Sequence, residues 1–180
     1  MTTTHKHLFK LTATGLLVAI GMLIPVYFPR VVIGPASYTL ASHVAIFIAM
    51  FISPTVAVAV TAGTTAGFFF TGLDIIIVLR AASHIIWALP GAIYLSKIDK
   101  FNAGWLKMRT LSLGVGIFHG LGEIAAVAIF FAGMGQDMDI TWLLGFIGLG
   151  TLIHSLVDFE IANAIRLILQ KQKGYRDLAG

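Results

Sequence analysis

The sequence predicts an all-α membrane protein, a compact bundle of six transmembrane helices in a single domain covering residues 1–180. Hydrophobic residues make up 58% of the chain and charged residues 11%, whereas soluble domains carry about a quarter charged residues. Mean hydropathy is +0.93. Successive apolar runs of about 17–25 residues, the length that crosses a bilayer, fill nearly the whole chain. No polar block is long enough for a soluble domain, so lipid is the expected surrounding.

Prolines and short polar segments mark the expected ends of these helices. Pro25 and Pro29 should end the first helix, because proline lacks a backbone N–H, and the Pro- and Gly-rich segment 27–37 predicts an ordered loop. Pro54 suits the first position of a new helix. Pro90 predicts a kink in the fourth helix or a shorter inner end. The six predicted helices cover residues 11–26, 38–52, 55–71, 75–95, 110–132 and 141–169.

The basic residues predict the orientation of the bundle. Ten of the twelve lysines and arginines fall in the N-terminal segment, the 96–109 connector and the C-terminal end. Six crossings place these three regions on one side, and the positive-inside rule makes that side cytoplasmic. We therefore expect a multi-pass protein of the cell membrane with both termini in the cytoplasm. Topology also explains the net charge of +4, so no nucleic-acid partner is expected.

Arg80 is a functional-site candidate because an ionisable residue at membrane depth is costly unless it faces protein, water or a ligand. His84 lies one turn away on the same helix face. A guanidinium suits a carboxylate ligand well. The alternative is an ion pair with Glu123 that fixes two helices, and a ligand could displace that pair.

Several helices carry polar residues into the outer half of the membrane. Helical rise puts Arg80 roughly 9 Å and His84 roughly 15 Å below the outer end of their helix, and Glu123 roughly 13 Å below the end of its own. This layout predicts a pocket that opens outward, although Ser and Thr also join membrane helices without any ligand. The candidate substrate-binding residues are Thr39, Ser42, His43, Arg80, Ser83, His84, Glu123 and Trp142.

Two further pairs, His119 with Glu123 and His154 with Asp158, repeat the i,i+4 spacing. Histidine and carboxylate are usual ligands of divalent metals. However, helical rise puts His119 and His154 about 20 Å below the outer surface, and the chain has neither His-x-x-x-His nor Glu-x-x-His. The sequence therefore favours internal polar packing, and we expect no metal site and no cofactor.

The sequence contains no pattern typical of an enzyme. There is no cysteine, Walker loop, Gly-x-Ser-x-Gly or dinucleotide fingerprint, so partner subunits would have to hydrolyse any ATP used. Two alternatives stay open. One is a stand-alone ion- or proton-coupled carrier using the His and acidic pairs, and the other is an intramembrane enzyme built on the same pairs.

The six-helix plan with basic ends resembles the substrate-binding (S) component of an energy-coupling factor (ECF) vitamin transporter. Residues 37–54 (SYTLASHVAIFIAMFISP) and 78–84 (VLRAASH) resemble the pantothenate-type group, with the nicotinate-type group a near competitor. The resemblance implies one vitamin bound from outside, and docking on a transmembrane scaffold (T) subunit that carries two cytoplasmic ATPases. Its docking motif, Ala-x-x-x-Ala, corresponds here to Gly15-x-x-x-Ala19, which also permits close packing.

The chemical structures of pantothenate and nicotinate distinguish the pantothenate-type group from the nicotinate-type group. Both are carboxylates and suit Arg80, but pantothenate adds two hydroxyls and an amide that would use the many polar groups of the expected pocket. Nicotinate needs fewer polar groups and more aromatic surface. The count of polar residues therefore favours pantothenate.

Overall fold

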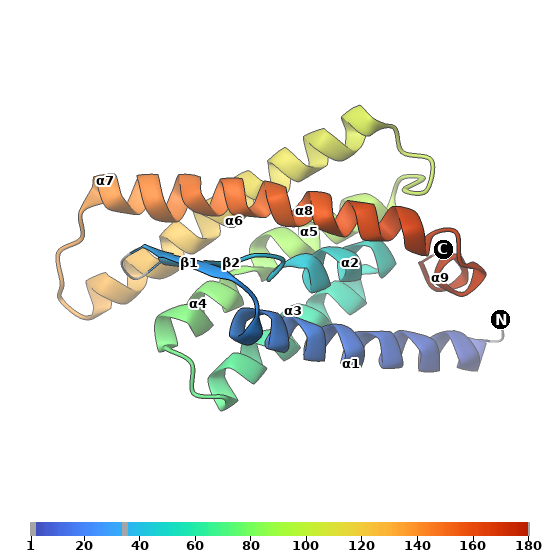
Figure 1. Cartoon of the computed structure of the whole chain (residues 1–180), viewed down its shortest axis with the longest axis horizontal. Helices are drawn as coiled ribbons and strands as arrows, with labels where there is room; N and C mark the ends of the chain where they lie inside the picture. Colours follow the sequence, from blue (N-terminus) through green and yellow to red (C-terminus); the bar gives the residue numbers. More distant parts are fainter. Residues whose placement is uncertain (1–2, 34–35, 180) are drawn as a thin grey trace.

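The computed structural model describes residues 3–33 and 36–179, which form helices and one short β-hairpin (Figure 1). The first helix is longer than its apolar run predicts and continues through Pro25. In chain order the elements are α1 (Thr3–Tyr27), β1 (Arg30–Ile33), β2 (Ala36–Thr39), α2 (Val44–Ile52), α3 (Pro54–Phe70), α4 (Ile75–Ser83), α5 (Ile85–Ser96), α6 (Trp105–Gly133), α7 (Ile140–Trp142), the π-helix η1 (Leu143–Leu149), α8 (Gly150–Leu169) and α9 (Lys173–Ala179).

In the described part of the chain, four helical segments are long and apolar enough to cross a membrane, which makes this an all-α membrane protein. The apolar helix α3 has only 17 residues. The nine residues of α2 rise about 14 Å, less than half of the roughly 30 Å hydrocarbon core of a bilayer. The expected count of six crossing helices is therefore not supported. The four long segments are Thr3–Tyr27, Ile75–Ser96, Trp105–Gly133 and Ile140–Leu169.

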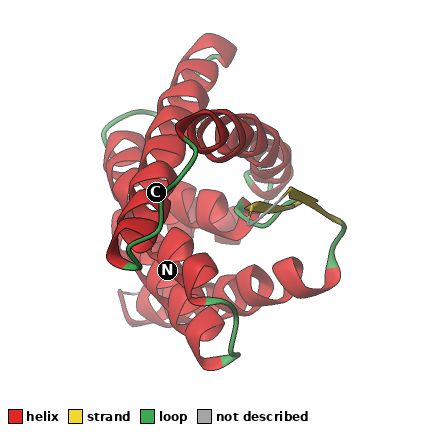
Figure 2. Cartoon of the chain, turned by 90° about the vertical axis from the view of Figure 1, so that its left-hand side faces the viewer, coloured by secondary structure: helices red, strands yellow, loops and turns green. Residues whose placement is uncertain are grey.

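A hairpin and a turn replace the beginning of the predicted second helix. β1 and β2 pair antiparallel, with Arg30 opposite Thr39, and the two strands stand out in yellow among the red helices of Figure 2. Ala41, in the following turn, has a φ of 68°, the left-handed region that a residue with a Cβ rarely adopts. Because the helix begins only at Val44, α2 is short, and all nine of its residues are buried.

The fourth predicted helix is interrupted, but at His84 rather than at Pro90. α4 ends at Ser83 and α5 begins at Ile85, while Pro90 lies inside α5 without ending it. The backbone carbonyl of His84 accepts both the Trp87 N–H, at 3.2 Å, and the Ala88 N–H, at 2.9 Å. The interruption leaves the His84 side chain buried between two helices.

Glycines allow α6 to pack closely on the last long segment. A Cβ built on Gly120 would lie 2.9 Å from the carbonyl oxygen of Gly148 in η1, and one on Gly116 would lie 2.8 Å from Leu152. Such spacing lets helix backbones approach in a membrane. The contact therefore fixes α6, which carries Glu123, against η1 and α8.

The beginning of α1 and the C-terminal helix α9 lie at the same end of the molecule (Figure 1). α9 was not predicted from the basic tail. It packs through Tyr175 and Leu178 against the apolar core around α2, and Gly174 lies near Phe9 of α1. The position of both ends agrees with an even number of crossings, and the cytoplasmic side remains a proposal from the charge pattern.

Candidate functional site

Glu123 on α6 is the meeting point of a buried polar network. Its Oε2 accepts hydrogen bonds from Arg80 Nε at 3.0 Å, Arg80 Nη2 at 2.7 Å and Thr151 Oγ1 at 2.6 Å. Its Oε1 faces His119 Nε2 at 3.4 Å and His84 Nε2 at 3.5 Å. The predicted Arg80–Glu123 pair is therefore present, and it joins α4 to α6.

Asp158 on α8 organises the turn that follows the hairpin. Its Oδ1 accepts the Ala41 backbone N–H at 2.8 Å, and its Oδ2 accepts the His43 backbone N–H at 2.9 Å. Oδ2 also lies 3.0 Å from His43 Nδ1 and 3.4 Å from His154 Nε2. Ser42 Oγ lies 3.2 Å from His43 Nδ1 and 3.1 Å from His154 Nε2. These contacts hold the left-handed Ala41 and orient the His43 ring.

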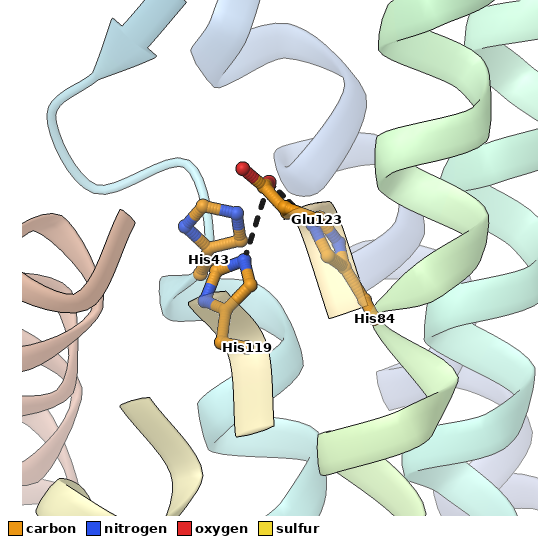
Figure 3. Close-up of side chains that lie close together, drawn as sticks. All are labelled: His43, His84, His119 and Glu123. Atoms are coloured by element: carbon orange, nitrogen blue, oxygen red, sulfur yellow. Dashed lines mark ion pairs between the residues drawn. The ribbon is translucent and has the colours of Figure 1, made fainter. Parts of the chain in front are cut away.

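Four imidazole rings gather between these two carboxylates. The His43 ring centroid lies 4.7 Å from that of His84, 4.5 Å from His119 and 4.9 Å from His154. Trp87 covers His119 with ring centroids 4.9 Å apart. Figure 3 shows His43, His84 and His119 directed toward one another and toward Glu123.

A cavity opens beside this cluster, with His43, His84, Arg80 and Glu123 in its wall. Its space free of protein atoms, including the open part at its mouth, is about 730 Å³. Helices α1, α2, α3 and α4, the loop before α4 and the hairpin supply the other walls. The remaining lining residues are Gly21, Pro25, Arg30, Ser37, Thr39, Ser42, Ile46, Thr64, Phe68, Leu73, Ile77 and Ala81.

Six of the eight predicted substrate-binding residues line this cavity, and two do not. Ser83 Oγ donates to the Arg80 carbonyl oxygen at 2.7 Å, so this hydroxyl hydrogen-bonds the last turn of α4. Trp142 packs beside Phe146 with ring centroids 6.4 Å apart. The six that line the cavity are Thr39, Ser42, His43, Arg80, His84 and Glu123.

The sequence argument that separated His119 and His154 from the site by depth is wrong. Both rings contact His43. The depths were counted from each helix end as if all ends lay in one plane, whereas α6 runs obliquely and extends well beyond the start of α4 (Figure 1). The i,i+4 pairing with Glu123 and Asp158 was the signal that would have placed both histidines in the network.

Thr151 was missed because nothing in the sequence distinguishes it from the other threonines of the helices. Tyr38 was also missed. Its ring lies 5.7 Å below the Arg80 guanidinium carbon, a cation–π contact, and its hydroxyl donates to the Phe146 carbonyl oxygen. The hairpin is thereby connected to both the charged network and η1.

Two groups of side chains in the described residues could hold a metal ion, and they share His43. The first adds His84, His119 and Glu123, and the second adds His154 and Asp158. In each group the candidate ligand atoms lie within 4.8 Å of one another.

Comparison with known proteins gives one informative similarity. The chain is 38% identical over 177 residues to the niacin transporter NiaX of Lactococcus lactis subsp. cremoris (strain MG1363), an alignment that covers 95% of this chain and 79% of that protein. No family model matches the chain, and no solved structure matches it significantly. The similarity therefore extends over nearly all the helices described above.

Proposed function

The chain belongs to the family of the niacin transporter NiaX, an S component of ECF transporters, and from this membership we propose that it is the membrane-embedded subunit that binds nicotinate for uptake. It would catalyse no reaction itself. A T subunit and two ATPases, the general partners of S components, would supply the energy. The charge pattern supports cytoplasmic termini and a cavity mouth on the outer side.

The observation that carries this proposal is the buried guanidinium in the cavity wall. Within the described residues, Arg80 hydrogen-bonds Glu123 through Nε and Nη2, so its Nη1 is available to a ligand. A carboxylate that meets an arginine in a site with little water gains a strong, charge-assisted contact. Nicotinate has one such carboxylate on a flat aromatic ring.

The preference for pantothenate, drawn from the number of polar residues, is not supported and is replaced by nicotinate. The oxygen atoms of this site are largely hydrogen-bonded within the protein: Glu123 Oε2 accepts three hydrogen bonds, and Ser42 Oγ lies between two histidines. Few are left for the hydroxyls and amide of pantothenate. The clustered imidazoles instead offer flat surfaces suited to an aromatic acid.

Equilibrium binding to the detergent-purified chain tests the proposal without any substitution. We expect nicotinate to bind, and nicotinamide, which lacks the carboxylate, to bind at least tenfold more weakly, because a hydrogen bond to a charged group contributes roughly 1.5–3 kcal/mol. Tighter binding of pantothenate would restore the pantothenate-type assignment. Binding of neither vitamin, together with proton-driven uptake by the chain alone in ATP-free liposomes, would favour a stand-alone carrier.

A substitution that keeps the charge tests Arg80 itself. Arg80→Lys retains a cation opposite Glu123 but loses the planar, multidentate geometry, so we expect weaker nicotinate binding in a folded protein. The matched control is Arg109→Lys, because Arg109 also pairs with a glutamate, Glu160 at 2.6 Å, but at an exposed position. Equal binding by both variants would remove Arg80 from the proposed site.

Gly15 and Ala19 support the proposed docking on a T subunit. Both lie on the exposed face of α1, and no described atom lies within 4 Å of a Cβ built on Gly15. By contrast, Gly63 and Gly67 pack against side chains of α1. The first pair is therefore available for contact outside the chain.

Bulky substitution tests this docking face. We expect Gly15→Leu and Ala19→Leu to reduce co-purification with the T subunit and the ATPases, because both close the surface needed for helix approach. Nicotinate binding by the isolated chain should not change. Ala125→Leu, at an exposed position of α6, is the control, and an equal loss of assembly there would contradict a specific role for α1.

A further inference from the structure

Four side chains from separate parts of the fold direct metal-ligating atoms at one point. His43 comes from the turn before α2, His84 from the break between α4 and α5, and His119 and Glu123 from α6. Their candidate ligand atoms lie within 4.8 Å of one another. Four tetrahedral ligands about 2.0–2.1 Å from a zinc ion lie about 3.4 Å apart. Small side-chain adjustments would therefore complete the coordination.

Three ring nitrogens of this cluster lack the hydrogen-bond partners that buried polar atoms normally have. In residues 3–33 and 36–179, His84 Nε2 and both ring nitrogens of His119 are buried without a hydrogen bond. His119 is fully buried, with 0% of its surface exposed. Both Nε2 atoms face Glu123 Oε1 within 3.5 Å. Buried polar atoms without partners are uncommon in native proteins and require an explanation.

The surrounding contacts hold these ligand atoms in place. Asp158 Oδ2 lies 3.0 Å from His43 Nδ1, which leaves His43 Nε2 for the cluster. Arg80 and Thr151 occupy Glu123 Oε2, which leaves Oε1 for the cluster. Carboxylate–histidine contacts and hydrogen-bonded ligand carboxylates are typical of the outer shell of metal sites.

We infer that His43, His84, His119 and Glu123 bind one divalent transition-metal ion of the zinc type at the floor of the cavity. Three imidazoles and one carboxylate suit Zn²⁺ and its first-row neighbours, whereas Mg²⁺ and Ca²⁺ prefer all-oxygen sites. This assignment reverses the expectation of no metal site, which rested on helical depths and on ligand spacing within single helices. It rests on the geometry of the ligand atoms and holds whichever vitamin the cavity takes.

The neighbouring group of His43, His154 and Asp158 is the weaker candidate. Asp158 already accepts two backbone N–H groups, from Ala41 and His43, besides its contact with the His43 ring. His154 Nε2 has a partner in Ser42 Oγ at 3.1 Å. These atoms have hydrogen-bond partners in the protein, whereas His84 Nε2 and both ring nitrogens of His119 in the proposed site have none.

Metal binding by the whole chain tests the inference. The chain is purified in detergent without a polyhistidine tag, on a His5→Ala/His7→Ala background so that the exposed histidines of α1 do not contribute. After treatment with a chelator it is titrated with Zn²⁺ and with Co²⁺. We expect one ion per chain and, with Co²⁺, visible absorption bands of a nitrogen-rich tetrahedral site. Absence of stoichiometric Co²⁺ binding in this chain would overturn the inference, independently of any variant at the site.

Substitutions then identify the ligands. His119→Gln and Glu123→Gln should weaken Co²⁺ binding at least tenfold and change the spectrum, whereas His154→Gln, at a buried histidine of the same cluster, should leave both unchanged. Size-exclusion chromatography reports whether each variant is folded. Loss of the ion in His154→Gln with retention in His119→Gln would overturn the ligand assignment in favour of the neighbouring group.

Discussion

Glu123 forms hydrogen bonds or ion pairs with more residues of the buried network than any other side chain of the proposed site, because each of its two oxygens has its own set of partners. It is 2% exposed, and a carboxylate so deep in the protein is unfavourable without partners. Oε2 receives Arg80 and Thr151, which joins three helical segments, α4, α6 and α8. Oε1 is left to the histidines. One carboxylate thus contributes to folding through one oxygen and to the proposed metal site through the other.

Because Arg80 and Glu123 form a buried ion pair, we expect removing Arg80 alone to lower the free energy of unfolding much more than removing both side chains. Arg80→Ala should destabilise the fold by about 3–5 kcal/mol, because it leaves a buried carboxylate without its counter-charge. Arg80→Ala/Glu123→Ala should destabilise it less, since no unpaired charge remains. Denaturant unfolding of the detergent-solubilised chain measures both.

The exposed pair of Arg109 and Glu160, 2.6 Å apart, is the control for this comparison. Arg109→Ala should cost less than about 1 kcal/mol. A single variant Arg80→Ala as stable as the double variant would contradict the assignment of Glu123 as a buried anion that depends on Arg80.

At the scale of elements, the contact between α6 and η1 is a close backbone approach that supports the site. It holds Glu123 and His119 opposite α8, and it depends on Gly120, whose Cα faces the backbone of Gly148. A backbone cannot yield as a flexible side chain can. The position of the proposed ligands on α6 therefore depends on the absence of a side chain at one residue.

Two glycines of α6 test this dependence. Gly120→Ala would place a Cβ 2.9 Å from the Gly148 carbonyl oxygen, so we expect a lower melting temperature. Gly114→Ala is the matched control, because no described atom lies within 4 Å of a Cβ there, and it should leave the melting temperature unchanged or slightly raised through better helix propensity. Equal melting temperatures for both variants would show that α6 and η1 can move apart without loss of stability.

Hydropathy alone predicted most of the long helices, because lipid contact requires apolar residues over a fixed length. The hairpin was not predicted, since its residues follow a tertiary contact: Asp158, far along the chain, holds Ala41 in an unfavourable conformation. The interruption at His84 was missed for a similar reason, as Pro90 gave the stronger local signal. Helices whose apolar sequence is required by the membrane could therefore be predicted. The hairpin and the break at His84, which depend on contacts of buried side chains, could not.

The site was predicted in part for the same reason. Charged and polar residues in apolar segments had to meet protein or ligand, so Arg80, His84 and Glu123 could be grouped from the sequence. The tilt of α6 and the shortness of α2 are properties of the packed bundle, and they bring His119 and His43 together. Neither property can be read from the sequence. The choice of vitamin depended on which polar groups remain free, and that requires their hydrogen bonds.

At the scale of the whole molecule, charge is divided between its two ends and its interior. Most basic residues lie at the end that holds both termini, while the cavity lies away from that end. In the buried cluster beside the cavity, Arg80 is balanced by Glu123, and Asp158, which contacts His43, adds a second negative charge. Arg30 is the other arginine of the cavity wall. With neutral histidines this cluster of Arg80, Glu123 and Asp158 carries a net negative charge, which is unfavourable for a nicotinate anion held against it. The proposed divalent ion would reverse the sign of that charge.

This balance predicts that nicotinate binding depends on the metal. Removing the ion with a chelator should weaken nicotinate binding at least tenfold, because a carboxylate would then approach a cluster of net negative charge in a site of low dielectric. Adding Zn²⁺ should restore it, whereas Mg²⁺, which prefers oxygen ligands, should not. Calorimetric titration of nicotinate into the metal-free and reloaded chain measures the difference. Equal affinity in the two forms would separate the ion from vitamin binding, and the positive charge that receives the carboxylate would then have to come from the arginines of the cavity wall, Arg80 and Arg30.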